Sequence, residues 1–221
     1  MDPNERYSRQ KDLVPAERLA GCQITVVGVG AIGRQVVLQL AAMGAMSLQL
    51  VDFDRVEESN LASQGYWEED MGQLKVQATG ILARKINPQI QVQELDQRFG
   101  RSMDVGNVLF SCVDSIVTRK LIWESVRNRV GFFCDTRMSA EVVRILAACD
   151  ASSREHYPTT LFEPQEAHAG SCTAKSTIYT AGIAAGLALG QFTRHLRNLP
   201  VDPDLTFNIL TSELALAVEV R

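Results

Sequence analysis

A glycine motif placed between an apolar strand and a helix is the feature that most constrains the fold. Gly28, Gly30 and Gly33 form GxGxxG. The run QITVVGVG from Gln23 is apolar and β-branched, and the run IGRQVVLQLAAMG that follows has helical spacing and stops at Gly44. Without side chains at the three glycines, a phosphate can approach backbone N–H groups at the helix N-terminus. The motif therefore predicts a nucleotide-binding strand-turn-helix unit.

Strands and helices alternate along most of the remaining sequence. The predicted strands are SLQLVDFD, QIQVQEL, NVLFSCVD, GFFCD and EVVRILAACD, and the helices between them are QLKVQATGILARKINP and SIVTRKLIWESVRNR. A long helix, TIYTAGIAAGLALGQFTRHL, and a closing strand pair, TFNIL with LALAVEV, end the chain. This order predicts an α/β fold: a Rossmann-like, doubly wound, mostly parallel sheet with helices on both faces and a C-terminal antiparallel strand extension.

A length of 221 residues favours one domain with one sizeable core. We expect four parts within it. They are an N-terminal helical arm over 1–20, a nucleotide-binding core over 21–150, a crossover loop over 151–174, and the long helix with the closing strands over 175–221. The loop is predicted because its sequence has no clear period and contains two prolines.

Charge and composition argue against several classes of protein. The chain has 22 basic and 26 acidic side chains with no block of like charge, so neither nucleic acid nor a membrane is an expected partner. No signal segment opens the sequence and no apolar stretch reaches the roughly 20 residues that span a bilayer, which predicts a cytoplasmic protein. Five cysteines without a CxxC pair indicate free thiols rather than disulfides or zinc ligands.

The glycine motif leaves the identity of the nucleotide open. Asp52 ends the second predicted strand, about 20 residues after Gly33, where a carboxylate accepts hydrogen bonds from ribose hydroxyls. Both NAD and ATP carry such a ribose. Residues outside the motif must therefore distinguish them.

The segment after the second strand makes that distinction. VDFDRVEESNLASQGYWEEDMGQLKVQA resembles the DxDxVxxSNLxRQ…GxxK stretch of the ThiF/MoeB/ubiquitin-activating family. Further similarity covers nearly the whole chain, in RYSRQ (6–10), CVDS with an arginine at 119, RM (137–138) and SC (171–172). The resemblance implies an enzyme that adenylates the C-terminal carboxylate of a ubiquitin-like or sulfur-carrier protein with ATP and Mg²⁺.

Adenylation gives these residues a chemical purpose. Attack of a carboxylate on the α-phosphate builds negative charge on the phosphate oxygens, so cations must face that charge. The resemblance implies roles for Asp52 and Asp54 at the nucleotide, for Asn60, Gln64 and Lys75 along the triphosphate, for Asp114 as the Mg²⁺ ligand, and for Arg9 at a neighbouring subunit's nucleotide. Simpler alternatives are a solvated helix lysine for Lys75, a helix N-cap for Asp114 and a surface charge for Arg9.

One position departs from the family pattern. NLASQ places Ser63 where the family has an arginine, so one phosphate contact is lost. Either Arg9, Arg55 or Arg98 replaces that cation, or the chain is a non-catalytic relative that binds nucleotide or a ubiquitin-like protein beside an active partner.

Cys172 stands near the start of the long helix, at the position of a family cysteine. A helix N-terminus lowers the pKa of a thiol, so Cys172 is a candidate acceptor of the activated acyl group. The alternative is a small buried side chain. The preceding loop carries His156, Tyr157, Glu163, Glu166 and His168, whose spacing fits no established metal site and favours solvated loop residues.

The sequence therefore predicts a minimal, homodimeric adenylating enzyme. Its partners would be a ubiquitin-like or sulfur-carrier protein and a downstream conjugating protein, and no zinc is expected. An NAD-dependent oxidoreductase is the rival that shares the glycine motif and Asp52 but gives Lys75 no task.

Overall fold

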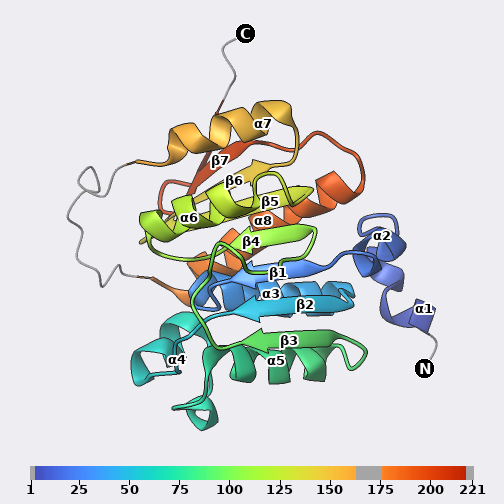
Figure 1. The fold of residues 1–221 in the computed structure, drawn as a ribbon. Coiled ribbons are helices and arrows are strands. Elements are labelled where there is room, and N and C mark those ends of the chain that lie inside the picture. The colour runs from blue at the N-terminus through green and yellow to red at the C-terminus, as the bar shows by residue number, and fades with distance from the viewer. Residues whose placement is uncertain (1–2, 163–175, 218–221) are drawn as a thin grey trace.

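An eight-stranded sheet forms the centre of the molecule. The computed structural model describes residues 3–162 and 176–217 (Figure 1). The strand order is β3-β2-β1-β4-β5-β6-β7-β8, in which the first five strands are parallel and the last four pair antiparallel. The strands are β1 (Ile24–Val27), β2 (Ser47–Val51), β3 (Gln91–Leu95), β4 (Val108–Ser111), β5 (Phe132–Ser139), β6 (Val142–Ala148), β7 (Asp204–Asn208) and β8 (Glu213–Leu216). The predicted fold class is confirmed.

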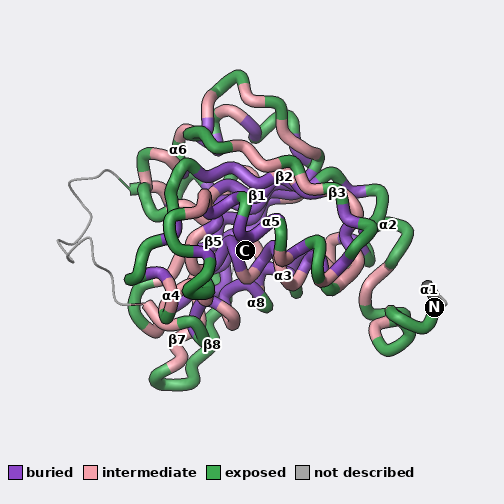
Figure 2. The backbone as a smooth tube through the Cα atoms, turned by 90° about the horizontal axis from the view of Figure 1, so that it is seen from below, coloured by how far each residue is buried: buried purple, intermediate pink, exposed green. Residues whose placement is uncertain are grey.

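Helices cover both faces of the sheet. On one face lie α3 (Ala31–Met43), α5 (Lys75–Ile86) and α8 (Ile178–Leu196), and on the other α6 (Ile116–Val126) and α7 (Ala151–His156). Figure 2 shows the buried residues concentrated in the sheet and the inner sides of these helices. The alternating strand–helix order puts successive crossovers on these faces, which is the arrangement the sequence pattern predicts.

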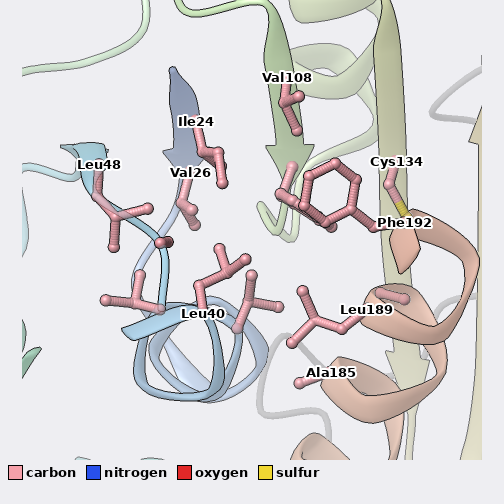
Figure 3. Packing of buried hydrophobic residues seen from close by; sticks show 14 of the residues in the cluster. Ile24, Val26, Leu40, Leu48, Val108, Cys134, Ala185, Leu189 and Phe192 are labelled. Atoms are coloured by element: carbon pink, nitrogen blue, oxygen red, sulfur yellow. The ribbon is translucent and has the colours of Figure 1, made fainter. Parts of the chain in front are cut away.

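Aromatic and aliphatic side chains fill the larger of the two cores. In Figure 3, α3 and α8 pack side by side under β1, β4 and β5, with Leu40 facing Leu189. The Phe192 ring lies 5.6 Å from that of Phe110 and 5.2 Å from that of Phe132, and none of the three is exposed. The small residues of α8, such as Ala185, let this helix approach the sheet closely.

The described part of the N-terminal arm consists of short helices. They are α1 (Pro3–Arg6), η1 (Ser8–Gln10) and α2 (Ala16–Ala20). Tyr7 packs against Gly44, and the Gln10 side chain donates a hydrogen bond of 2.6 Å to the carbonyl oxygen of Met43. The arm therefore lies against the C-terminal end of α3.

Two sequence predictions need correction. The strand expected at GFFCD continues to Ser139, because its second half pairs antiparallel with β6. The expected loop over 151–174 begins with α7 and the 3-10 helix η3 (Tyr157–Thr160); Asp150 caps α7 by accepting a 2.8 Å hydrogen bond from the Ser153 N–H. The segment between β2 and α5, to which the sequence analysis assigns no element, contains the short helices α4 (Glu58–Gln64) and η2 (Glu68–Asp70).

Within residues 3–162 and 176–217, no helix has the length and apolar character needed to cross a membrane.

Candidate functional site

The glycine loop lies where the direction of the strand order reverses. β1 has β2 on one side and β4 on the other, so the loop after β1 sits at the switch point of the parallel sheet. Gly28 has a φ of +85°, and a Cβ atom there would come within 2.9 Å of the Cys112 carbonyl oxygen after β4. A Cβ atom on Gly33 would overlap the carbonyl oxygen of Gly28. Both positions require glycine because backbone fills the space.

Gly30 has a different task. It is the N-cap of α3, and a Cβ atom there would have only ordinary contact, 3.7 Å from Oε1 of Gln64. The N–H groups of the first turn of a helix have no partners within the helix, so this end of α3 is suited to an anion. The backbone therefore requires glycine at Gly28 and Gly33, whereas at Gly30 the loop leaves room for an anion.

Asp52 fastens the glycine loop to the end of β2. Its Oδ2 accepts a 2.7 Å hydrogen bond from the Val29 N–H, and its Oδ1 accepts one of 2.9 Å from the Asp54 N–H. Burial raises the pKa of Asp52, although both backbone N–H groups favour the ionised form. Each carboxylate oxygen keeps a second lone pair that can accept from a ribose hydroxyl.

Lys75 is the first residue of α5 and its side chain is buried. Nζ lies 3.1 Å from Oδ2 of Asp54, and the Lys75 side chain is 8% exposed against 49% for Asp54. The Lys75 N–H also donates to the carbonyl oxygen of Asp54, at 2.9 Å. The solvated alternative for Lys75 is therefore wrong: this ammonium group is held at the carboxyl edge of the sheet, beside the strand that carries Asp52.

Helix α4 brings two amide side chains to the same edge. Oδ1 of Asn60 accepts from the Glu57 N–H at 3.1 Å and holds the first turn of α4. Oε1 of Gln64 is buried next to Gly30 and has no hydrogen-bond partner among the described residues. Ser63 donates to the Ser59 carbonyl oxygen at 2.9 Å and supplies no charge.

Asp114 lies between β4 and α6 with an exposed side chain. The alternative that it caps α6 is wrong, because Ser115 is the N-cap and accepts from the Thr118 N–H. No hydrogen bond or ion pair joins the Asp114 carboxylate to the residues described. Since Mg²⁺ is usually held by one or two carboxylates plus phosphate oxygens and waters, a single free carboxylate here fits that ion.

A buried charge cluster supports the strand end beside Asp114. Sequence reasoning pointed to its two arginines, at 119 and 137, but not to its aspartate. Asp135 on β5 is fully buried and forms ion pairs with Arg119 and, at 2.8 Å, with Arg137. Tyr157 donates to the Asp135 carboxylate at 3.0 Å. Burial, together with the charge of Arg137, lowers the pKa of Arg119 to about 10. Arg119 also donates to the carbonyl oxygen of Val113, which fixes the backbone next to Asp114.

Two loop residues differ from their predicted setting. Tyr157 is buried in the Asp135 cluster, and His156 lies 3.0 Å from Asp204, so neither is a solvated loop residue. Glu163, Glu166, His168 and Cys172 lie outside the described residues.

Arg9 is not brought to the site of its own chain. It is an exposed residue of η1, and its neighbour Gln10 is bonded to the C-terminal end of α3. The glycine loop lies at the N-terminal end of that helix, whose 13 residues span about 20 Å. Arg9 is therefore remote from Lys75 and Asp52 within one subunit.

A separate hollow lies at the opposite edge of the sheet. A cavity of about 500 Å³ opens towards the amino ends of β1, β2 and β3. Its side chains satisfy one another: Thr25 donates to Gln49 at 2.9 Å, and Gln49 donates to Gln93 at 3.1 Å. Ligands of parallel α/β sheets bind at the carboxyl ends of the strands, so we place the site at the glycine loop.

Comparison with known proteins identifies the family. A sequence model of the ThiF family matches residues 7–213. The chain belongs to the ThiF family.

Several curated relatives of this ThiF-family chain match somewhat more than half of it. The SAMP-activating enzyme E1 of Haloferax volcanii is 33% identical over 129 residues, which cover 53% of this chain and 48% of the relative. The sulfur carrier protein ThiS adenylyltransferase of Escherichia coli is 33% identical over 128 residues, covering 53% and 51%. The molybdopterin-synthase adenylyltransferase of Salmonella typhimurium is 32% identical over 142 residues, covering 59% and 54%. The matched region thus spans about half the length of these relatives.

Solved structures confirm the fold. PaaA has a TM-score of 0.77 and 17% identity, and the match covers 96% of this chain and 72% of that one. MccB of E. coli, crystallised with ATP, has a TM-score of 0.74 and 17% identity, covering 97% and 71%.

We expect the buried Asp135 cluster to be needed for stability. Asp135→Asn removes the charge that pairs with two buried guanidinium groups, so the free energy of unfolding should fall by about 3–5 kcal/mol. Urea titration measures this change. Asp104→Asn is the matched control, because the Asp104 side chain is fully exposed and lies 3.7 Å from Arg129. Its unfolding midpoint should stay where it is; equal effects of the two substitutions would contradict the assignment.

Proposed function

We propose that this ThiF-family chain binds MgATP at the glycine loop and adenylates the C-terminal carboxylate of a ubiquitin-like or sulfur-carrier protein. The observation that carries the proposal is the buried Lys75 ammonium beside the Asp52–Asp54 segment. An NAD-dependent dehydrogenase works at its nicotinamide and gives a buried lysine at the phosphate end no task. The names of the relatives, which include adenylyltransferases, support a proposal of adenylation for this chain.

The reaction joins one bond and breaks another. A carboxylate oxygen of the protein substrate attacks the α-phosphorus of ATP, the bond from the α-phosphorus to the bridging oxygen breaks, and pyrophosphate leaves. Negative charge grows on the phosphate oxygens during this step. Lys75 offers three N–H donors, of which Asp54 occupies one in the free protein, so the ammonium can turn to the phosphates without leaving its pocket.

The remaining residues would bind and orient. The Gly30 end of α3 would receive a phosphate, Asp52 would accept from the ribose, and the free Oε1 of Gln64 would accept from a donor on the ligand side of the loop. Asn60 would support this arrangement by fixing α4. Asp114 would hold Mg²⁺, which neutralises charge on the leaving pyrophosphate.

Arg98 is the best substitute for the arginine that Ser63 replaces. Its guanidinium carbon lies 3.8 Å from the centre of the ring of Phe53, the residue between Asp52 and Asp54 in the sequence. The side chains of Arg98 and Phe53 are both exposed. Arg55 instead donates to the Gly72 carbonyl oxygen at 2.8 Å, and Arg9 lies at the far end of α3. Of the three candidates, Arg98 is the one whose guanidinium lies over the residue that joins Asp52 to Asp54.

The uncharged Ser63 also supports a second candidate function, a non-catalytic subunit that binds nucleotide or a ubiquitin-like protein. Such a subunit would bind ATP and form no adenylate.

Removing Lys75 should weaken ATP binding. A hydrogen bond to a charged group contributes about 1.5–3 kcal/mol, so Lys75→Ala should raise the Kd for MgATP roughly 10- to 150-fold in calorimetric titration. The matched control is Lys85→Ala on the same helix, since Lys85 is exposed and lies over the Trp67 ring. Unchanged affinity in Lys75→Ala, or tighter binding of NAD than of ATP by the unmodified protein, would refute the nucleotide assignment.

Formation of the acyl-adenylate can be observed directly. Small ubiquitin-like proteins with a free C-terminal glycine, incubated with the enzyme and MgATP, should gain the mass of AMP; a thioester to Cys172 should appear as a covalent adduct that Cys172→Ala lacks. ATP binding without any adenylate across such a panel, followed by adenylation once Ser63→Arg is introduced, would favour the non-catalytic subunit.

A homodimer would bring Arg9 of one subunit to the nucleotide of the other. In that case Lys75→Ala and Arg9→Ala proteins are each impaired, and equal mixing after subunit exchange should restore about a quarter of the activity, because half the dimers are mixed and each holds one complete site. Pyrophosphate exchange measures this recovery. No recovery on mixing would place Arg9 outside the reaction.

A further inference from the structure

Arg34 is a buried cation that the proposed mechanism does not use. It follows Gly33 on α3, is 1% exposed and is the largest fully buried side chain of the described chain. One terminal nitrogen donates to the Gly65 carbonyl oxygen at 3.0 Å, and the other lies 3.4 Å from Oγ1 of Thr79. Its Nε is buried and has no hydrogen-bond partner within residues 3–162 and 176–217. Burial lowers the pKa of Arg34, while Tyr66 and Asp70 favour its charged form.

Tyr66 is the second half of this arrangement. The guanidinium carbon of Arg34 lies 4.0 Å from the centre of the Tyr66 ring. The Tyr66 hydroxyl donates to the carbonyl oxygen of Val29 at 2.6 Å and lies 3.0 Å from Oγ1 of Thr79. Burial raises the pKa of Tyr66 well above its ordinary value, so the hydroxyl stays a donor.

Together the two side chains join three separate segments. Val29 lies in the glycine loop, Gly65 ends the helix that carries Asn60 and Gln64, and Thr79 lies one turn after Lys75 on α5. Every segment that carries a proposed phosphate-binding residue on this side of the sheet is therefore bonded to Arg34, to Tyr66 or to both.

An apolar side chain would fill this space at lower cost. Replacing a buried charge by a hydrophobic residue of similar volume is often neutral or stabilising, because the charge no longer has to be desolvated. What an apolar residue cannot do is hold a carbonyl oxygen and stack flat on a ring at the same time, which the planar guanidinium does. The presence of arginine at this place therefore indicates geometry rather than stability.

We propose that Arg34 and Tyr66 form a positioning unit that sets the glycine loop, α4 and α5 at the spacing required by the nucleotide. Neither residue is a ligand contact in this proposal, because the terminal nitrogens of Arg34 and the hydroxyl of Tyr66 are directed at Gly65, Thr79 and Val29. The inference rests on the proposed nucleotide site and adds to it two residues that act through backbone carbonyl groups.

Three variants test the unit, and a fourth serves as control. Arg34→Met keeps the volume and removes the charge, Arg34→Lys keeps the charge and loses the stacking plane, and Tyr66→Phe keeps the ring and loses the hydroxyl. Arg144→Met is the control, because Arg144 also forms an ion pair with a buried aspartate, Asp204 on β7, away from the glycine loop. Urea unfolding, the Kd for MgATP and hydrogen exchange of the nucleotide-free protein are measured for each.

We expect Arg34→Met and Tyr66→Phe each to weaken MgATP binding about tenfold, with faster exchange at residues 28–33 and 58–66. The double variant should raise the Kd for MgATP about as much as either single variant does, since both residues belong to one unit. Arg34→Lys should lie between Arg34→Met and the unmodified protein. Arg144→Met should lower the unfolding midpoint and leave the Kd and the exchange of the loop unchanged.

Two results would overturn the inference. One is unchanged affinity and loop exchange in Arg34→Met, and the other is a Kd effect in Arg144→Met as large as that in Arg34→Met. If the unmodified protein binds no ATP, the proposed function fails; hydrogen exchange of the nucleotide-free variants then still decides whether Arg34 and Tyr66 hold the loop.

Discussion

The close approach of three backbone segments at the glycine loop is the constraint on which the rest of the structure depends. Gly28 touches the backbone after β4, and Gly33 has its Cα against the Gly28 carbonyl group, so neither position can carry a side chain. This contact brings the N-terminus of α3 to the carboxyl ends of β1 and β4. Because the strand order reverses there, the residues that follow β2 and β4 are directed towards the same point from opposite sides.

Charges at this edge are arranged in two different ways. On the β2 side, Asp54 holds Lys75 and is itself half exposed, so a ligand phosphate can compete for the ammonium. On the β5 side, Asp135 is fully buried between Arg119 and Arg137 and no solvent reaches it. The Asp54–Lys75 pair can therefore exchange partners when a ligand binds. The buried Asp135 cluster is instead a fixed support for the backbone that carries Asp114.

Much of the fold could be predicted from the sequence because its signals are local. Apolar period, the glycine motif and the acid at the end of β2 define the parallel half and the switch point without knowledge of contacts. The helices that the sequence pattern did not predict, α4 and α7, are short, and the side chain that each buries, Asn60 or Ser153, is polar. They therefore have capping residues such as Asp150 but no apolar period. The extension of β5 depends on its pairing with β6, which sequence period does not report.

The candidate site was harder to predict where a side chain acts through distant backbone. Lys75 and Asp114 stand at family spacing, so the resemblance located them, yet their burial and exposure came only from the structure. By helical period Arg34 is simply a polar residue on α3, and its partners at Gly65 and Thr79 are far along the chain. The loss of arginine at 63 therefore has two separable consequences. A replacement charge for the phosphates would come from Arg98, while Arg34 holds the loop from inside, with its terminal nitrogens directed at Gly65 and Thr79.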